Sequence, residues 1–238
     1  MTNLDLSTSV GDWVAQRPGT SRVFEKLGID YCCGGRKTLQ QACDDQQVDA
    51  RAVMNQLQNA VDHSTPSVAD WTAASLTELC DHIEQTHHAY LRGELPQLTE
   101  LFEKVVAAHG ETHPELTQLS RVFAALRAEL EPHMFKEEQI LFPAIRQLER
   151  SASPPAFPFG TVANPIRMME HEHDNAGRAL AEIRQLTDDF QPPENACNSY
   201  RVLYERLRGL EADMHQHVHK ENNILFPRAI GKQEQPVA

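Results

Sequence analysis

The sequence predicts an all-α protein, in which a small helical N-terminal domain precedes an up-down-up-down four-helix bundle. After residue 75, apolar residues recur at three- and four-residue spacing over long stretches, which is typical of amphipathic helices. Breaks rich in proline and glycine divide these stretches into four segments, and no segment alternates apolar and polar residues for long enough to form a sheet. Four long helices joined by short connections pack as a bundle.

Residues 1–62 contain shorter periodic segments between glycine and proline turns, so we assign them to a separate small domain. Three or four short helices are expected there, for example at about 21–27, 37–45 and 49–61. Gly34-Gly35 marks a tight loop, because glycine permits a positive φ or a close approach of the backbone to another group. A polar, turn-rich stretch follows, which leads us to place a linker at 63–74 and the bundle at 75–232.

The first bundle helix begins near residue 75 and continues to His109-Gly110, with a kink expected at Pro96. A proline-rich stretch at 151–160 connects the second helix to the third. The remaining bundle helices are expected at 114–150, 162–189 and 194–230.

Charge and composition exclude several kinds of partner. The chain has 22 basic and 34 acidic residues, a net charge of −12, so neither nucleic acid nor an anionic membrane surface is an expected partner. No apolar run approaches the roughly 20 residues of a membrane span, and the first residues lack the features of a secretory signal. We therefore expect a soluble protein of the cytoplasm. The five cysteines form an odd, irregular set, which indicates reduced thiols.

A repeated motif carries the chemistry. The segment HMFKEEQILFP begins at His133 and the segment HVHKENNILFP begins at His217, an offset of 217 − 133 = 84 residues. In each copy a glutamate follows the histidine by four residues, at Glu137 and Glu221, with the same offset of 84. This spacing places the imidazole and the carboxylate on one helix face, about one turn apart.

Each copy has a further histidine upstream, since His88 precedes His133 by 45 residues and His173 precedes His217 by 44. Periodicity alone leaves open whether His88 or its neighbour His87 faces the bundle interior. Four imidazoles and two carboxylates from four helices are typical of a dinuclear site for iron, manganese or zinc.

A simpler interpretation competes with the metal site. A single histidine–glutamate pair at this spacing is usually a solvated surface pair, and two pairs in register could be a relic of duplication. However, polar pairs on core-facing helices are costly unless they are satisfied, and metal binding would satisfy all six side chains. The other histidines, at 63, 109, 113, 171, 215 and 219, are expected in loops or on solvated flanks.

Two adjacent cysteines, Cys32 and Cys33, precede the glycine pair. A disulfide between neighbouring residues is strained, and the spacing does not match a zinc knuckle. One interpretation is a packed cysteine beside an exposed one. The other is a functional thiol pair that accepts electrons, nitric oxide or a transferred metal. The remaining cysteines are expected to be structural: Cys43, Cys80 and Cys197.

Together these motifs resemble a known family. His88 with Leu95-Pro96, the two repeated segments, the Glu-His-Asp triplet around His173 and the DYCCGG element at 30–35 are similar to the RIC proteins, also called the YtfE/ScdA family. These are di-iron proteins with a hemerythrin-like domain. The resemblance extends over residues 9–230, and the distance to Leu95-Pro96 favours His88 over His87 as the inward-facing residue.

The resemblance implies a non-haem centre of two iron ions, oxo-bridged when oxidised, in which Glu137 and Glu221 bridge the irons. It also implies repair of iron–sulfur clusters damaged by nitric oxide or peroxide, with iron supplied from a labile site and the damaged iron–sulfur proteins as partners. Glu129, one turn before His133, and Glu172, next to His173, are weaker candidates for support of the ligands. The implied ligands are His88, His133, Glu137, His173, His217 and Glu221.

The sequence departs from the oxygen-carrying hemerythrins at two places. Those proteins have another histidine four residues after the third-helix ligand, where this chain has Gly177, and they end with a His-x4-Asp pair rather than His-x3-Glu. The missing imidazole leads to the hypothesis that the centre is reactive or its iron labile.

Alternatives to repair are a sensor that binds nitric oxide or oxygen, and a di-iron enzyme that reduces nitric oxide; the sequence alone does not decide whether the protein is an enzyme. A structural zinc site is least favoured, because it takes four ligands around one ion. A homodimer is compatible with the sequence.

Overall fold

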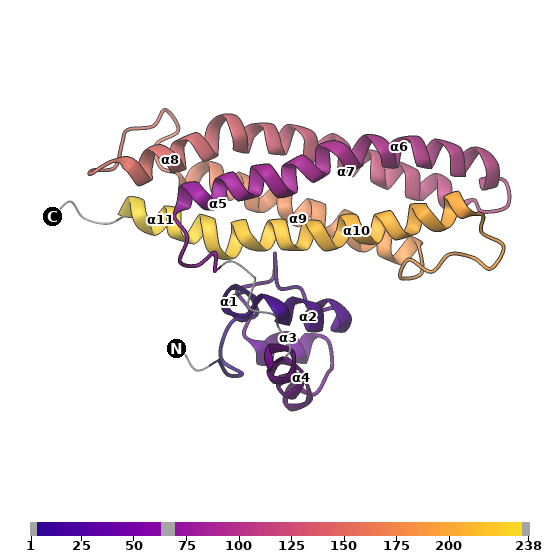
Figure 1. Ribbon diagram of the computed structural model, residues 1–238, viewed down its shortest axis with the longest axis horizontal. Helices are drawn as coiled ribbons and strands as arrows, with labels where there is room; N and C mark the ends of the chain where they lie inside the picture. The colour runs from indigo at the N-terminus through magenta and orange to yellow at the C-terminus, as the bar shows by residue number, and fades with distance from the viewer. Residues whose placement is uncertain (1–3, 63–69, 235–238) are drawn as a thin grey trace.

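The protein is helical throughout the part that the structure describes. The computed structural model describes residues 4–62 and 70–234 (Figure 1). In these two ranges the only β contacts are the isolated bridges between Ser9 and Thr38 and between Phe157 and Gly160. The prediction of an all-α fold is therefore confirmed. Within the same ranges, no helix is long and apolar enough to cross a membrane.

The described part of the N-terminal domain contains four helices, within the three or four that the sequence predicts. The helix that had no predicted range, α1, is only seven residues long, and Ser9 caps its first turn by accepting a hydrogen bond from the backbone N–H of Asp12. A buried cluster that includes Trp13, Phe24 and Leu57 holds the helices together. The four helices are α1 (Val10–Gln16), α2 (Ser21–Leu27), α3 (Leu39–Asp45) and α4 (Ala50–Asp62), with a 3-10 turn, η1 (Pro18–Thr20), before α2.

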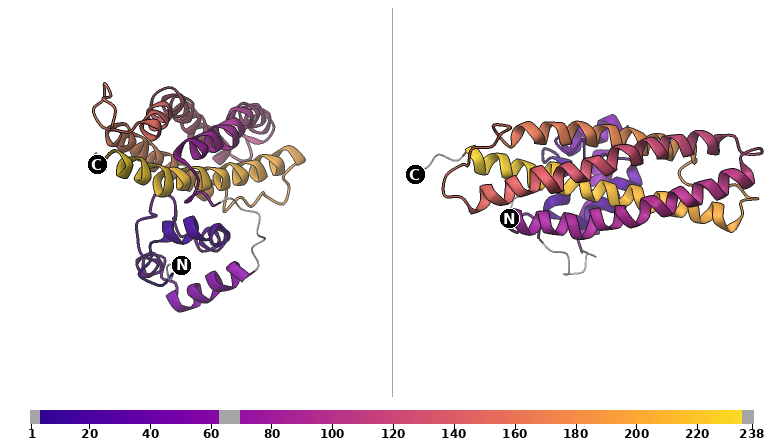
Figure 2. Two further views of the ribbon diagram at one scale, coloured as in Figure 1. Left: turned by 60° about the vertical axis from the view of Figure 1, so that its left-hand side comes forward. Right: turned by 90° about the horizontal axis from the view of Figure 1, so that it is seen from above.

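Four long rods form the bundle, and they lie side by side in Figures 1 and 2. We call each of these long helical stretches a rod. Three of the four rods are interrupted by a short π-helical segment, so that one predicted helix corresponds to several consecutive elements. The first rod is α5 (Leu76–Ile83), η2 (Glu84–His88) and α6 (Ala89–His109). The second is α7 (Glu115–Lys136), η3 (Glu137–Leu141) and α8 (Phe142–Arg150). The third is α9 (Ala163–Leu186), and the fourth is α10 (Asn198–Lys220), η4 (Glu221–Leu225) and α11 (Phe226–Glu234).

The π-helical segments in the two repeated motifs have a local cause. The backbone N–H of Phe142 donates to the carbonyl of Glu137, and that of Phe226 donates to Glu221, each five residues back. A proline follows at the next position of both motifs. Proline has no N–H and its ring crowds the carbonyl four residues back, which favours a widened turn at this point. Both widened turns begin at a repeated glutamate.

The bundle core is divided into two apolar clusters with a polar layer between them. One cluster lies toward the loops that join α6 to α7 and α9 to α10, and includes Phe102, Phe123 and Leu207. The other lies toward the opposite end and includes Ile145 and Ile166. All six predicted ligands lie between the two clusters, so the apolar packing on both sides fixes the positions of the four rods at this level.

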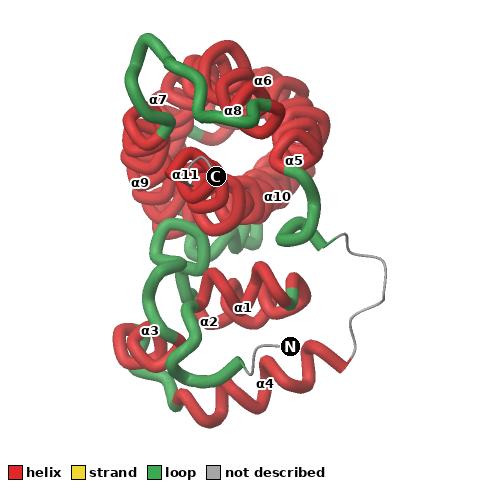
Figure 3. Tube along the Cα trace, turned by 90° about the vertical axis from the view of Figure 1, so that its left-hand side faces the viewer, coloured by secondary structure: helices red, strands yellow, loops and turns green. Residues whose placement is uncertain are grey.

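The N-terminal domain packs against the bundle face formed by α9 and by α10 with α11 (Figure 3). The side chain of Asn223 in η4 donates hydrogen bonds to the carbonyls of Tyr31 (3.3 Å) and Cys32 (2.9 Å). A Cβ atom on Gly11 or Gly35 would lie 2.5 or 2.2 Å from Asn223 Oδ1. The glycine pair was predicted to mark a tight loop. At Gly35 the lack of a side chain allows the backbone to lie close to Asn223 of η4.

Residues 63–69 of the predicted linker lie outside the described residues. The described remainder, from Asp70 to the start of α5, forms a turn in which Asp70 accepts hydrogen bonds from the backbone and hydroxyl of Thr72. Ser75 and Glu78 then form a capping box at the start of α5.

Candidate metal centre

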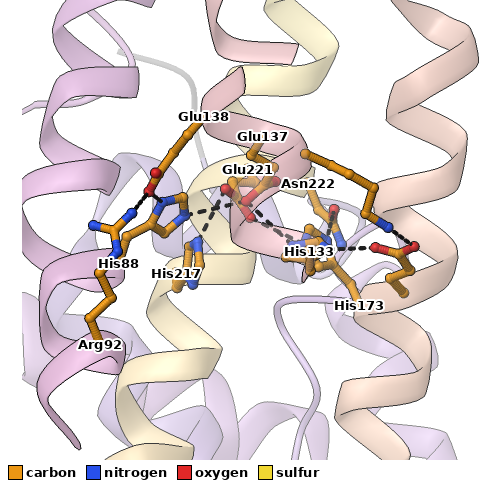
Figure 4. A network of polar contacts seen from close by, with 11 residues as sticks. His88, Arg92, His133, Glu137, Glu138, His173, His217, Glu221 and Asn222 are labelled. Atoms are coloured by element: carbon orange, nitrogen blue, oxygen red, sulfur yellow. Dashed lines mark hydrogen bonds and ion pairs between the residues drawn. The ribbon is translucent and has the colours of Figure 1, made fainter. Parts of the chain in front are cut away.

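The structure brings the six predicted ligands together in the polar layer (Figure 4). Their ligand atoms form two groups, and within each group all atoms lie within 4.8 Å of one another. Both carboxylates belong to both groups, while each group has two imidazoles of its own. The groups are His88 and His217 with Glu137 and Glu221, and His133 and His173 with the same two glutamates.

The contacts within the cluster are close and almost fully shielded from solvent. His88 Nε2 lies 3.3 Å from Glu137 Oε2, and His133 Nε2 lies 3.4 Å from the same oxygen. On the other carboxylate, His173 Nε2 lies 3.2 Å from Glu221 Oε2 and His217 Nε2 lies 3.2 Å from Oε1. The side chains of both glutamates are fully buried.

The donor set fits a cation better than it fits a closed hydrogen-bond network. Both oxygens of Glu137, Oε2 of Glu221 and Nε2 of His88 are buried without a hydrogen bond. Buried carboxylates without partners are costly, and a shared cation would satisfy them. Imidazole nitrogens and carboxylate oxygens suit iron, manganese and zinc, so the residues present fit iron, the metal that the family resemblance implies, but do not select it.

The charges within the cluster shift the pKa values of its imidazoles and carboxylates. Burial alone would lower the pKa of His173, but the carboxylate of Glu221, whose Oε2 lies 3.2 Å from Nε2, outweighs burial and raises the pKa to about 9. Burial likewise favours a neutral Glu221, yet the two imidazoles beside it, His217 and His173, hold the pKa of Glu221 well below its usual range. A cation that enters between these groups displaces the imidazole protons.

Three of the four histidines are oriented through their second ring nitrogen. His88 Nδ1 lies 2.6 Å from Glu138 Oε1, and the same carboxylate pairs with Arg92. His173 Nδ1 lies 2.8 Å from Asn222 Oδ1. A hydrogen bond to one ring nitrogen fixes the ring orientation and directs the other nitrogen to the metal.

The third oriented histidine, His133, is held by Glu172, which the sequence indicated as a candidate for support of the ligands. His133 Nδ1 lies 2.8 Å from Glu172 Oε2, and Lys136 pairs with the other oxygen. The hydrogen bond from His133 is the main cause that lowers the pKa of Glu172 to about 2. Glu129, in contrast, lies on the exposed face of α7 and has no hydrogen bond to the described residues of the site.

Glu138 and Asn222 were not predicted from the sequence, although they occupy equivalent positions in the repeat. Their offset, 222 − 138 = 84, is that of the ligands, and Lys136 and Lys220 share it. Each of these pairs therefore occupies equivalent positions in the two motifs. Every residue of one motif has a counterpart in the other at this offset, so the offset alone does not distinguish these supporting residues from their neighbours.

The pseudo-symmetry is broken at the fourth histidine. By the offset 173 − 88 = 85, the equivalent of Glu172 is His87. His87 stacks on His217 with ring centroids 5.2 Å apart and an angle of 2°, and it lies 2.8 Å from both Asp213 Oδ1 and Lys220 Nζ. His217 Nδ1 itself has no hydrogen bond.

Two expectations about the remaining histidines and cysteines need correction. His219 is buried, because its ring packs edge-on against Tyr31 of the N-terminal domain, 5.5 Å away. Cys197 is exposed rather than structural and lies 3.1 Å from His109 Nε2, whereas Cys43 and Cys80 are buried as expected. His63 lies outside the described residues.

The fold and the polar layer define the class of the protein. A four-helix bundle with histidines and glutamates gathered between two apolar clusters is the arrangement of hemerythrin-like proteins. The family model described as the hemerythrin HHE cation binding domain matches residues 81–229. A second model, described as a domain of unknown function (DUF542), matches residues 6–61.

Comparison with curated proteins identifies the family within the hemerythrin-like class to which the chain belongs. The chain is 37% identical over 223 residues to the iron-sulfur cluster repair protein YtfE of Musicola paradisiaca, a match that covers 93% of this chain and 96% of the relative. The YtfE proteins of Edwardsiella ictaluri and Yersinia pseudotuberculosis are 40% and 38% identical, with the same two coverages. The chain belongs to the YtfE family.

Proposed function

We propose that the polar layer binds two iron ions, one in each group of ligands, with Glu137 and Glu221 shared between them. The observation that carries this proposal is the composition of the two groups. Each group has two histidines that the other lacks, and both groups contain the same two glutamates. Bound iron would supply a redox-active Lewis acid at this position. The chain's own residues hold the imidazoles in place through Glu138, Glu172 and Asn222.

We further propose that the protein repairs iron–sulfur clusters damaged by nitrosative or oxidative stress, and that it does so by supplying iron from this site. Relatives of similar length carry the name iron-sulfur cluster repair protein. In this proposal iron is cargo, damaged iron–sulfur proteins are the partners, and the cytoplasm is the place of action.

The ligand set supports release of iron rather than permanent storage. Each group has only two imidazoles and two shared carboxylates. Gly177, one turn after His173 on α9, adds no side chain to the layer. Because each iron ion would have few protein ligands, some of its coordination positions would be free for a competing ligand. An acceptor protein could therefore take the iron from the site.

The test is reactivation of a purified iron–sulfur protein that nitric oxide has inactivated. The iron-loaded protein should restore activity in near-stoichiometric amounts and lose its own iron as it does so. Glu221→Gln should abolish the effect because it weakens both groups, whereas Glu103→Gln, on the exposed face of α6, should leave it unchanged. Equal reactivation by metal-free protein would contradict iron supply. Consumption of many equivalents of nitric oxide without a client would instead establish an enzyme.

A further inference from the structure

A second cluster of potential metal ligands lies in the N-terminal domain, outside the polar layer of the bundle. The carboxylate of Asp30 and the thiols of Cys32 and Cys33 have ligand atoms that all lie within 4.8 Å of one another. Cys32 Sγ is 3.2 Å from Asp30 Oδ1. We propose that these three residues form a separate binding site for a thiophilic divalent metal of the Fe²⁺ class.

The two thiols are poorly suited to form a disulfide with each other or to react as free thiolates. Adjacent residues bring their Cα atoms closer together than an unstrained disulfide allows. The Cys32 thiol is almost completely buried, and a hydrogen bond with Cys33, followed by burial, raises its pKa well above the usual value. A divalent metal removes this constraint, because it takes the place of the thiol protons and releases them to solvent.

The loop that carries the three residues is already fixed in shape. Asp30 Oδ1 accepts hydrogen bonds from the backbone N–H groups of Cys32 and Cys33, both at 3.0 Å, and Oδ2 accepts from Gly34 at 2.9 Å. Asn223 holds the carbonyl of Cys32 from the bundle side. A metal that takes the position of the Cys32 thiol proton beside Asp30 leaves these backbone hydrogen bonds in place, so binding needs little reorganisation.

The cluster lies directly against the helix that carries a ligand of the bundle site. Cys33 Sγ is 3.6 Å from the backbone carbonyl of His173. It is also 3.7 Å from the point where a Cβ atom on Gly177 would stand, so a side chain at this position would be in van der Waals contact with the thiol. If the proposed iron-supply function holds, this is the first thiolate site that iron leaving the His133–His173 side of the bundle would meet.

The donor set indicates which metals bind. Two thiolates select soft or borderline ions, and one carboxylate adds a charge that favours divalent over monovalent ions. Cobalt(II) is a suitable probe, because thiolate ligation produces a charge-transfer absorption that ligation by imidazole and carboxylate does not. The bundle site contains no sulfur donor, so this absorption reports the N-terminal site alone even when the bundle also binds cobalt.

The experiment is a cobalt titration of the full chain under anaerobic conditions, after the bundle has been loaded with iron and the iron bound outside the bundle has been removed with a mild chelator. The wild-type protein should bind about one further cobalt ion and develop the thiolate absorption. Cys33→Ser and Asp30→Asn should each reduce that binding at least about tenfold. Cys197→Ser, which removes an exposed thiol with no second thiol nearby, should match the wild type. Binding without thiolate absorption, or equal absorption in Cys33→Ser and wild type, would overturn the proposal.

A second measurement uses the wild-type protein alone, so its result does not depend on whether a variant folds. Alkylation of Cys33 in the wild-type protein, followed by mass spectrometry, should slow at least about tenfold when cobalt is added, whereas alkylation of Cys197 should not change. Alkylation of Cys33 at the same rate with and without cobalt would overturn the site. Neither measurement depends on cluster repair, so a protein that fails to reactivate clients can still bind cobalt here.

Discussion

At the scale of single residues, the centre is organised as two nearly equivalent halves whose supporting groups differ. His88 is oriented by the carboxylate of Glu138, whereas the equivalent His173 is oriented by the neutral amide of Asn222. A carboxylate raises the basicity of the imidazole that donates to it more than an amide does. The equivalent histidines His88 and His173 are therefore supported by groups of different charge, although each group of ligands has one histidine that a carboxylate supports, His88 through Glu138 and His133 through Glu172.

The charge at Glu138 should matter for metal affinity. In Glu138→Gln the side chain can still accept a hydrogen bond from His88, but the negative charge is lost. We expect metal affinity to fall about 10- to 100-fold, as measured by competition with a chelator. Glu103→Gln changes the net charge equally but on an exposed helix face, and should have no effect. Equal affinities for the two variants would show that Glu138 does not tune the site.

The sequence predicted which residues converge but not what supports them. The six residues could be found because the motif recurs with a constant offset, and the structure places all six in one layer. Glu138 and Asn222 carry no periodic signal of their own, and they are informative only once the histidines of neighbouring helices have been placed. Glu129 lies one turn from His133 along the helix but on its exposed side, so the spacing did not produce a contact.

At the scale of helices, the long elements were predictable and their local irregularities were not. The four bundle helices follow from apolar periodicity, whereas α1 is too short for a periodic signal and depends on packing of Val10 and Trp13 in the domain core. The π-helical segments were also missed. Two of them are followed by a proline, but η2 has no proline beside it and offers no sequence signal.

The start of the first bundle helix depends on a residue from the second. Glu149 in α8 accepts hydrogen bonds from the backbone N–H groups of Leu76 (2.6 Å) and Thr77 (2.9 Å) at the start of α5. Burial alone would raise the pKa of Glu149, but the hydrogen bonds from Thr77 and Leu76 outweigh it and hold the pKa below 4.5. The ionised carboxylate thus joins two rods at the bundle end.

Glu149→Gln should lower the free energy of unfolding by about 1 kcal/mol near neutral pH, because it removes a charged cap from a helix N-terminus. A depressed folded-state pKa contributes stability above the unfolded value, and the contribution is lost as the pH falls through the folded value. The difference between variant and wild type should therefore shrink below about pH 4.5. Urea unfolding of the metal-free proteins checks this; a difference that persists unchanged in acid would point to packing instead of charge.

At the scale of the whole molecule, the two domains meet where the metal ligands are supported. Asn222 orients His173, and the next residue, Asn223, holds the loop that contains the adjacent cysteines. Both asparagines follow Glu221 in η4. The N-terminal domain is therefore attached to the same widened turn that carries a shared carboxylate.

Gly35→Ala should detach the N-terminal domain without unfolding the bundle. The added methyl group would lie 2.2 Å from Asn223 Oδ1, so Asn223 would have to rotate and give up its hydrogen bonds to Tyr31 and Cys32. We expect a cost of about 1–3 kcal/mol and a larger radius of gyration by small-angle X-ray scattering. In Gly93→Ala the methyl group meets nothing within 4 Å, so this variant should keep the wild-type scattering. An unchanged radius in Gly35→Ala would contradict this account of the interface.

The most direct test of the shared-carboxylate centre is the metal content of the wild-type protein and of Glu221→Gln, both purified without oxygen. Because Glu221 belongs to both groups of ligands, its loss should weaken both metal positions together. We predict two irons per chain in the wild type, with charge-transfer absorption that develops on exposure to air, and the loss of both irons in a Glu221→Gln variant that remains folded. A variant that keeps one tightly bound iron, or a wild-type protein that contains zinc alone, would contradict the account.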